Sequence, residues 1–232
     1  MNRETTNRIR FVIEDLLPPI LRDSTLFLWL AKRVWGEHMS HLARFRERAP
    51  FLTAEEYAEL YRNHPRVHVG TDNSAACIRR INAMVEGTSV CDVGCGTGSL
   101  LTHMRAAHPD LRRLVGVDFV VDDAADIKGV EYVAAKIESL PFADGEFDTV
   151  VCTHVIEHVL DYKQAIAELR RIAKKRLIIV VPREREYRYT FNPHFNFFPY
   201  TYAFLRAVHP VPTVYVCEDI ARDIFYSEDR LG

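Results

Sequence analysis

The sequence lacks a membrane-spanning segment and a secretory signal. No apolar run reaches the roughly 18–20 residues of a membrane-spanning helix. The N-terminus has no charged stretch, apolar core and small-residue cleavage site in succession, which argues against a secretory signal. The five cysteines show neither paired metal-ligand spacing nor a disulfide framework. Free thiols are typical of a reducing compartment, so we expect a cytoplasmic protein.

An excess of either charge is also missing. Thirty basic side chains face 32 acidic ones in 232 residues, which excludes a strongly basic protein. The apolar fraction of 48% excludes a disordered chain. Residues 87–161 hold thirteen acidic and five basic side chains, whereas residues 163–188 hold nine basic and three acidic ones. This pattern is typical of solvated faces, but it also suits a cationic ligand followed by an anionic substrate.

From residue 89 onward, short apolar runs alternate with segments long enough for helices. The runs cover residues 89–93, 114–117, 130–133, 149–152 and 177–181, and the helical segments include 99–107 and 161–173. Buried strands that alternate with amphipathic helices indicate an α/β fold, a parallel sheet with helices on both faces. Two later runs, at 213–217 and 223–226, predict an antiparallel hairpin that closes the sheet.

The first 70 residues follow a different pattern. Pro18-Pro19 interrupts any helix, and the next segment is rich in Leu, Phe and Trp, with Lys32-Arg33 beside it. This segment suits either a lid whose apolar face packs on the main domain, which we favour, or a helix on a membrane surface. Thr53 and Glu56 form a capping box that predicts a helix over 53–61, and another helix is expected over 72–85. We therefore expect an N-terminal helical lid at residues 1–70 that covers the substrate, and a main domain at 71–232.

A glycine-rich loop carries the clearest functional signal. Gly94, Gly96 and Gly98 follow a predicted strand and open a predicted helix, a turn at which a ligand can approach the backbone closely. Asp118 ends the next strand, where its carboxylate can accept hydrogen bonds from both hydroxyls of a ribose. Asp92 stands just before the loop and would repel a pyrophosphate. Its carboxylate suits a ligand with an amino group and a sulfonium cation instead.

These motifs together resemble those of class I S-adenosylmethionine (SAM) dependent methyltransferases of the type 11 kind. The resemblance covers about residues 72–181, with Asp92–Gly98 as its first motif and Asp118 as its second. Leu140–Phe142 and Asp144–Asp148 resemble the segment that leads into the fourth strand of that family. The resemblance implies a Rossmann-like domain whose seven-stranded, mostly parallel sheet ends in an antiparallel C-terminal hairpin. An aromatic insertion at 183–212 would interrupt it.

The resemblance also implies a SAM site. The residues expected to contact SAM are Asp92, Gly94, Gly96, Gly98, Asp118, Phe119, Ile137 and Thr153. Asp92 would hold the amino group, Asp118 the ribose, and Phe119 and Ile137 the two faces of adenine. Many relatives carry an acid where this chain has Lys136, so either Glu138 or the backbone would meet the adenine amino group.

A cluster of histidines follows the fourth predicted strand. His154, Glu157 and His158 have i, i+3, i+4 spacing, which predicts one face of a helical turn, and His194 follows the fifth strand. Such a set could bind a divalent metal, or His154 or His158 could act as a metal-free general base. The histidines could also be purely structural. The cluster resembles the Glu-x-x-Glu-His motif of small-RNA 3′-terminal 2′-O-methyltransferases, with His154 in place of the first Glu.

The function expected from these features is SAM-dependent methyl transfer to an oxygen of a small molecule or saccharide. Metal-dependent RNA 2′-O-methylation is the second possibility, although the overall acidic balance opposes it. The third is a SAM-binding protein without catalysis. A dinucleotide-dependent oxidoreductase is a distant fourth.

Overall fold

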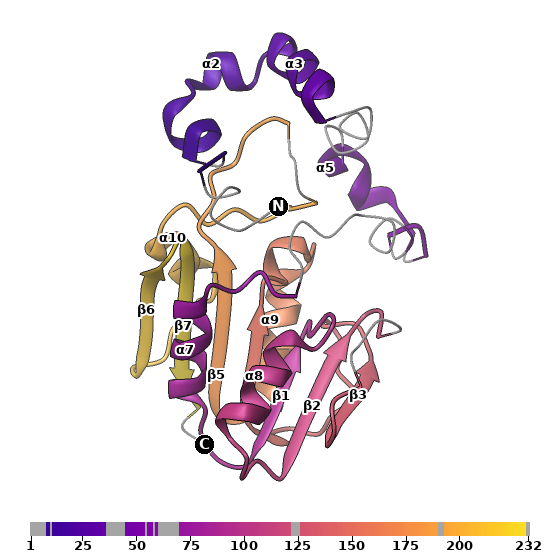
Figure 1. The fold of residues 1–232 in the computed structure, drawn as a ribbon, viewed down its shortest axis with the longest axis vertical. Coiled ribbons are helices and arrows are strands. Elements are labelled where there is room, and N and C mark those ends of the chain that lie inside the picture. The colour runs from indigo at the N-terminus through magenta and orange to yellow at the C-terminus, as the bar shows by residue number, and fades with distance from the viewer. Residues whose placement is uncertain are drawn as a thin grey trace.

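A seven-stranded sheet forms the centre of the computed structural model, with strand order β3-β2-β1-β4-β5-β7-β6 (Figure 1). The structure describes residues 8–9, 11–35, 45–53, 55–57, 59, 70–121, 126–189 and 193–230. The parallel strands are β1 (Ser89–Val93), β2 (Arg113–Asp118), β3 (Val130–Ala134), β4 (Phe147–Thr153) and β5 (Ala173–Pro182). The expected α/β architecture is therefore confirmed.

Helices cover both faces of the sheet, because the side chains that point to each face from the central strands are apolar. Helices α7 (Ala75–Met84) and α8 (Ser99–Ala107) bury Cys77, Ile81 and Leu101 on one face. Helices α9 (Tyr162–Ile172) and α10 (Thr201–Ala207) pack on the other. Helix α7 begins at residue 75 rather than 72, because the Ser74 hydroxyl caps it by accepting the Cys77 N–H at 3.1 Å.

The predicted C-terminal hairpin is confirmed and is longer than expected. It consists of β6 (Tyr215–Ile220) and β7 (Asp223–Asp229), and β7 pairs antiparallel with β5. Its two-residue connection, Ala221-Arg222, has positive φ at both positions, as a tight hairpin turn requires. The hairpin thus supplies the edge of the sheet.

The N-terminal segment lies beyond the carboxyl ends of the parallel strands (Figure 1). It contains η1 (Val12–Leu16), α2 (Pro19–Arg22), α3 (Thr25–Trp35), α5 (Phe45–Arg48) and η2 (Ala49–Phe51). The capping box is confirmed, since Thr53 N–H donates to Glu56 Oε2 at 2.7 Å and Glu56 N–H to Thr53 Oγ1 at 3.2 Å. Residues 54, 58, 60 and 61 of that predicted helix lie outside the described residues.

The expectation that the apolar face of the N-terminal lid packs on the main domain is wrong for α3. Leu26, Trp29, Leu30 and Val34 are about half exposed or more. The part of the segment that precedes α3 is attached through polar contacts, among them an ion pair of 3.1 Å between Asp15 and Arg222. Polar attachment leaves the apolar side chains of α3 on the outside.

The aromatic insertion packs between the N-terminal segment and the sheet. The Phe45 and Phe195 rings lie 4.9 Å apart, and the N–H groups of Phe195 and Asn196 donate to the Glu157 carbonyl. The insertion is therefore fixed to the chain that leaves β4. Within the described part of the chain, no helix is long and apolar enough to cross a membrane, and the five cysteines are free thiols.

Candidate functional site

The glycine loop connects the carboxyl end of β1 to α8. The N–H groups of Gly94 and Cys95 donate to the Val117 carbonyl at the end of β2, which holds the loop against the neighbouring strand. Gly94 has φ +83, and a Cβ there would lie 2.0 Å from Val155 Cγ2. Gly96 has φ +53, and a Cβ there would meet nothing within 4 Å. Protein contacts therefore require glycine at Gly94, and also at Gly98, where a Cβ would lie 2.5 Å from the Tyr132 hydroxyl, whereas Gly96 borders open space beside the loop.

Asp92 carries a carboxylate that is almost completely buried. It is 1% exposed, and its Oδ1 has no hydrogen-bond partner among the described residues. Burial raises the pKa of Asp92 to about 7, and the nearby negative charge of Asp118 adds to the effect. A buried, unpartnered carboxylate beside an open loop fits the amino group of SAM.

Asp118 lies at the end of β2, beside the same loop. Its Oδ2 accepts the Gly96 N–H at 2.8 Å, and its Oδ1 accepts the Val120 N–H at 3.2 Å. These bonds fix the carboxylate, and each oxygen retains a lone pair for a ribose hydroxyl. Asp92, the loop and Asp118 therefore converge as the sequence predicts, and together they fit SAM.

The other predicted SAM contacts are placed less uniformly. Lys136 Nζ lies 5.8 Å from the Phe119 ring centroid, so a lysine shares the predicted adenine position. Ile137 is 8% exposed and packs in the core. Thr153 is buried, and its Oγ1 accepts the Asn73 side-chain N–H at 2.9 Å. The roles of Phe119, Ile137 and Thr153 in SAM binding stay predictions.

Two polar residues near the loop were not found from the sequence. Asn73 precedes α7, is 7% exposed, and has an Oδ1 without a hydrogen-bond partner among the described residues. Tyr132 on β3 also has an unpartnered hydroxyl, 2.5 Å from where a Cβ on Gly98 would lie. The chain separation of 80 residues between Asn73 and Thr153 explains why no local pattern revealed the first.

The histidine cluster differs from the expected helical face. The 3-10 helix η3 spans only Ile156–His158, and His154 precedes it with φ +56. His154 and His158 therefore do not share a helical face. The expected four-residue metal set is also not found, because the group that could hold an ion consists of Glu157, His158 and His194. The left-handed backbone at His154 turns the chain before the helix begins.

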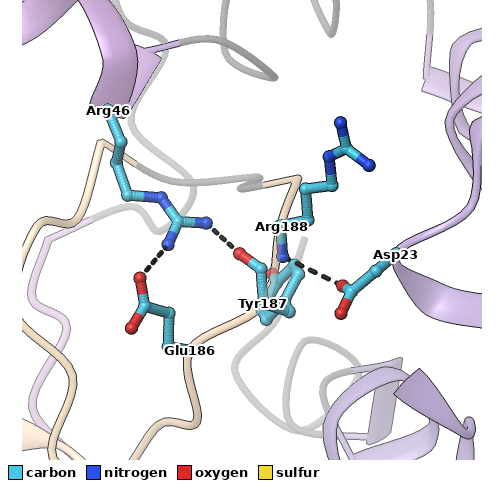
Figure 2. Close-up of a pocket in the computed structure, with 5 residues that line it drawn as sticks. All are labelled: Asp23, Arg46, Glu186, Tyr187 and Arg188. Carbon is cyan, nitrogen blue, oxygen red and sulfur yellow. Dashed lines mark hydrogen bonds and ion pairs between the residues drawn. The ribbon is translucent and has the colours of Figure 1, made fainter. Parts of the chain in front are cut away.

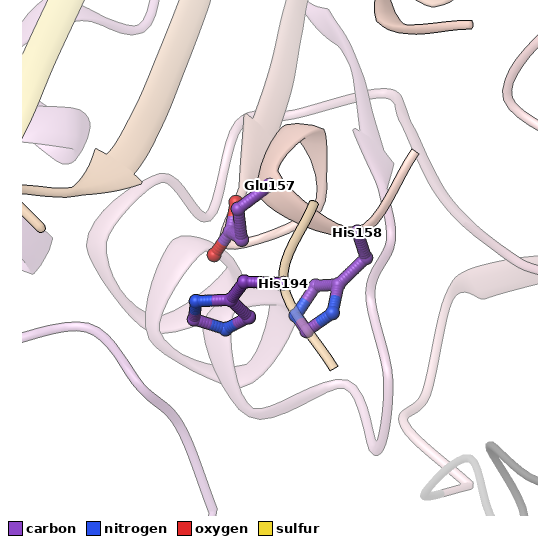
Figure 3. A group of neighbouring side chains, drawn as sticks. All are labelled: Glu157, His158 and His194. Carbon is purple, nitrogen blue, oxygen red and sulfur yellow. The ribbon is translucent and has the colours of Figure 1, made fainter. Parts of the chain in front are cut away.

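The ligand atoms of Glu157, His158 and His194 all lie within 4.8 Å of one another (Figure 3). Glu157 is 1% exposed, and its Oε2 has no hydrogen-bond partner among the described residues. The His158 and His194 rings meet edge to face, with centroids 4.6 Å apart. One carboxylate and two imidazoles are suitable ligands for a divalent transition metal.

The neighbours of the two imidazoles determine which ring nitrogens face the group. His158 Nδ1 lies 3.0 Å from the Pro193 carbonyl, and His194 Nδ1 lies 2.6 Å from Glu184 Oε2. If each Nδ1 carries the proton, it donates to that oxygen and leaves Nε2 with a lone pair. A carboxylate behind a histidine is a common arrangement in metal sites. Glu184, which the sequence did not reveal, is itself buried.

The protonation of the cluster follows from its surroundings. Burial alone would lower the pKa of His154, but Glu157, at 3.6 Å, and Asp223, at 4.0 Å, outweigh burial and raise it. Burial and His194 lower the pKa of His158 to about 4. Burial would raise the pKa of Glu157, but the surrounding imidazoles lower it. The cluster thus holds an ionised carboxylate beside a neutral His158 at neutral pH.

The basic stretch at 163–188 is largely neutralised within the molecule. Six of its nine basic side chains form ion pairs with carboxylates: Arg170, Arg171, Lys175, Arg176, Arg183 and Arg185. Most of the basic side chains expected to meet an anionic substrate are therefore paired with carboxylates of the same chain.

A separate cavity of about 410 Å³ lies between the N-terminal segment and the insertion. Figure 2 shows its lining. The Arg46 guanidinium donates hydrogen bonds to Glu186 and to the Tyr187 carbonyl, and the backbone N–H of Arg188 donates to Asp23. Its two acidic and two basic side chains balance. The cavity thus offers no excess charge to a ligand.

Residues 91–181 match the family model described as "Methyltransferase domain". The ubiquinone/menaquinone biosynthesis C-methyltransferase UbiE of Geotalea uraniireducens is 35% identical over 99 residues, covering 38% of this chain and 42% of that protein. UbiE of Geobacter sulfurreducens is 30% identical over 138 residues, covering 53% and 52%. The chain thus spans about half the length of these relatives.

Among solved structures, a SAM dependent methyltransferase from Aquifex aeolicus superposes with a TM-score of 0.53. Its sequence is 16% identical, and the match covers 65% of this chain and 87% of that one. At this identity the similarity establishes a common fold and nothing more.

Proposed function

We propose that this protein is a SAM-dependent methyltransferase that methylates an oxygen of a small molecule or saccharide, on the premise that residues 91–181 match the methyltransferase domain. The observation that carries the SAM half of this proposal is the buried, unpartnered Asp92 carboxylate beside the open side of Gly96. The relatives named C-methyltransferases act on carbon, so the acceptor atom must be argued from this chain's own residues.

The loop residues have distinct roles in the proposed SAM site. Asp92 holds the amino group, Gly94, Gly96 and Gly98 line the methionyl and ribose portions, and Asp118 accepts the ribose hydroxyls. Phe119, Ile137 and Thr153 complete the site at adenine and near the methyl group. When bound, SAM supplies an electrophilic methyl group on a cationic sulfur. The chain therefore mainly has to align the acceptor and exclude water.

The buried imidazoles favour an oxygen acceptor, because a hydroxyl must lose its proton as it is methylated. His154 or His158 takes that proton while the acceptor oxygen bonds to the methyl carbon and the carbon–sulfur bond breaks. The electron pair of the broken bond stays on sulfur, which becomes a neutral thioether. His154 follows β4 directly, and its Nε2 has no hydrogen-bond partner among the described residues. We assign His154 as the first choice for the base.

Residues 1–70 and the insertion at 183–212 form the proposed cover over the acceptor. Tyr57 supports this role, since its hydroxyl donates to the His158 carbonyl at 2.8 Å and its ring stacks near Phe195. The cover thus contacts the histidine cluster directly. Its aromatic side chains suit a sugar or a ring-containing acceptor better than an extended polyanion.

A metal-assisted form of the same reaction is the second candidate, favoured by the closeness of Glu157, His158 and His194. These three residues would hold a divalent cation, and Glu184 would orient His194. A bound cation would lower the pKa of the acceptor hydroxyl. His154 contacts Glu157 and Asp223 and would lie outside the ligand set.

Transfer of labelled methyl groups from SAM to hydroxylated small molecules, saccharides and RNA tests the acceptor. Asp118→Ala should abolish SAM binding in calorimetry, and with it all transfer. Label on a carbon, or in RNA alone, would overturn the proposed acceptor. SAM binding without transfer to any of the three classes would favour a non-catalytic SAM-binding protein.

Calorimetry with zinc or manganese ions alone tests the cluster. His194→Ala and Glu157→Gln should each weaken metal binding at least about tenfold, as loss of a ligand does. His103→Ala, which removes an exposed imidazole on α8, should have no effect. Equal binding by all four proteins would contradict the metal-assisted form and leave the metal-free base.

A further inference from the structure

The N-terminal segment exposes more apolar surface than any other part of the described chain. Fifteen large apolar side chains are exposed among the described residues, and nine of them lie between positions 11 and 34. These nine are Phe11, Val12, Leu16, Ile20, Leu21, Leu26, Trp29, Leu30 and Val34. Exposed apolar side chains that gather in one segment in this way mark an interaction site.

Helix α3 presents this surface as a stripe. Leu26, Trp29, Leu30 and Val34 follow i, i+3, i+4, i+8 spacing, so they share one face, and they are 62%, 53%, 48% and 70% exposed. Ala31, on another side of the helix, is 2% exposed. A helix on the surface of a water-soluble protein normally has the reverse arrangement, with its apolar stripe buried. The outer face of α3 is therefore suited to an apolar environment.

Polar contacts fix the opposite side of the segment to the rest of the molecule. The Arg22 guanidinium is buried, 5.4 Å from the Tyr187 ring centroid, and Asp23 accepts the Arg188 N–H at 2.9 Å (Figure 2). These contacts join the turn before α3 to the insertion. They hold the segment beyond the carboxyl ends of the strands (Figure 1), and the side chains of the α3 stripe stay exposed.

The charges of α3 indicate the chemistry of the partner. The helix carries Lys32 and Arg33 and no acidic residue. The Arg33 guanidinium lies 5.2 Å from the Trp29 ring centroid. Tryptophan and arginine together suit the headgroup level of a bilayer, where the ring is partly apolar and the cation meets lipid phosphates.

We propose that α2 and α3 dock this protein on an anionic lipid surface, with the α3 stripe among the acyl chains and Lys32 and Arg33 at the phosphates. Eleven residues rise about 16 Å, too short to cross an apolar layer about 30 Å thick, so α3 lies in the interface plane. A symmetric pair of chains joined through this face would bring its cations together, whereas anionic lipid neutralises them. The inference is independent of the acceptor.

Vesicle co-sedimentation of the full chain tests the proposal. Vesicles of phosphatidylcholine with phosphatidylglycerol should bind the protein, and vesicles of phosphatidylcholine alone should bind it clearly less. Trp29→Ser with Leu30→Ser should weaken binding about tenfold or more, because two apolar side chains no longer enter the lipid. Lys32→Glu with Arg33→Glu should remove the preference for the anionic vesicles.

The matched control is Val214→Ser, which removes a side chain of similar exposure, 48%, next to β6 and far along the chain from α3. It should bind vesicles like the unaltered protein. Circular dichroism and SAM binding establish that each variant is folded. A loss of vesicle binding is thereby distinguished from a loss of the folded, SAM-binding protein. Equal binding by the Trp29→Ser, Leu30→Ser protein would overturn the proposal. So would a dimer in sedimentation equilibrium that this variant dissociates.

Discussion

The α/β domain at residues 71–232 and the N-terminal segment turn opposite kinds of side chain outward. In the domain, β4 and β5 bury apolar residues on both faces, and α9 buries Ile166, Leu169 and Ile172. In the segment, Arg22 and Glu14 are buried while the α3 stripe is exposed. Apolar burial therefore stabilises the domain, whereas polar contacts position the part of the segment around α2 and leave the apolar surface of α3 available.

A second contrast lies within the site, between two carboxylates that are each 1% exposed. Asp92 lies near Asp118, and its pKa rises to about 7. Glu157 lies among imidazoles, and its pKa falls. Burial is the same, but the neighbouring charges differ in sign. Asp92 is thus prepared for a cation from outside, whereas Glu157 already has internal partners.

The largest expected effect is on the packing of the domain. Arg170→Met removes a guanidinium that binds Glu228 at 2.9 and 2.6 Å. That carboxylate, 0% exposed, keeps the Tyr226 hydroxyl and a longer ion pair of 3.5 Å with Arg230. The free energy of unfolding in urea should fall by about 3–5 kcal/mol. Arg80→Met, which breaks the partly exposed pair with Glu218, should cost less than about 1 kcal/mol. Equal costs would contradict the contrast between buried and exposed pairs.

The next effect separates the two roles of the glycine loop. Gly94→Ala places a Cβ against Val155 at φ +83 and should destabilise the domain by about 2–4 kcal/mol. Gly96→Ala meets no protein atom and should cost only about 1 kcal/mol, yet it should still weaken SAM binding. Thermal unfolding and calorimetry of both proteins measure this. Unchanged SAM affinity in Gly96→Ala would place the cofactor elsewhere.

The pH dependence of SAM binding tests Asp92. Because the cation should bind ionised Asp92, affinity should fall up to about tenfold per pH unit below about 7 and level off above it. Asp92→Asn should bind SAM weakly, with an affinity that does not change over this pH range.

Stability without SAM should change in the opposite direction. The folded pKa is raised above the ordinary 3.8, so the contribution of Asp92 to stability is complete below that value and is lost as pH rises through about 7. Asp92→Asn should therefore gain stability relative to the unaltered chain as pH rises. A difference in the free energy of unfolding between the two proteins that stays constant from about pH 4 to about pH 8 would contradict the pKa assigned to Asp92.

The smallest effect belongs to the outer face of α3. Trp29→Ser should change the free energy of unfolding by less than about 0.5 kcal/mol, because the side chain is 53% exposed. Phe45→Ala in the same segment removes a ring that is 2% exposed and contacts Phe195, and should cost about 3 kcal/mol. A large loss in Trp29→Ser would mean that α3 packs within the protein after all.

The sequence by itself determined the succession of strands and helices along the chain, the glycine loop with Asp92 and Asp118, and the closing hairpin. These features depend on local periodicity and on turn residues, which neighbours along the chain are sufficient to specify. Helix α7 begins three residues after the predicted start at residue 72, because the Ser74 side chain provides the N-cap.

The tertiary structure alone decided which side chains meet across long stretches of chain. It excluded His154 from the group of Glu157, His158 and His194, and it placed Glu184 behind His194. It also turned the apolar stripe of α3 outward. Each outcome depends on contacts between distant segments or on one left-handed residue, and hydrophobic spacing, which reports only the period of an element, contains no information about either.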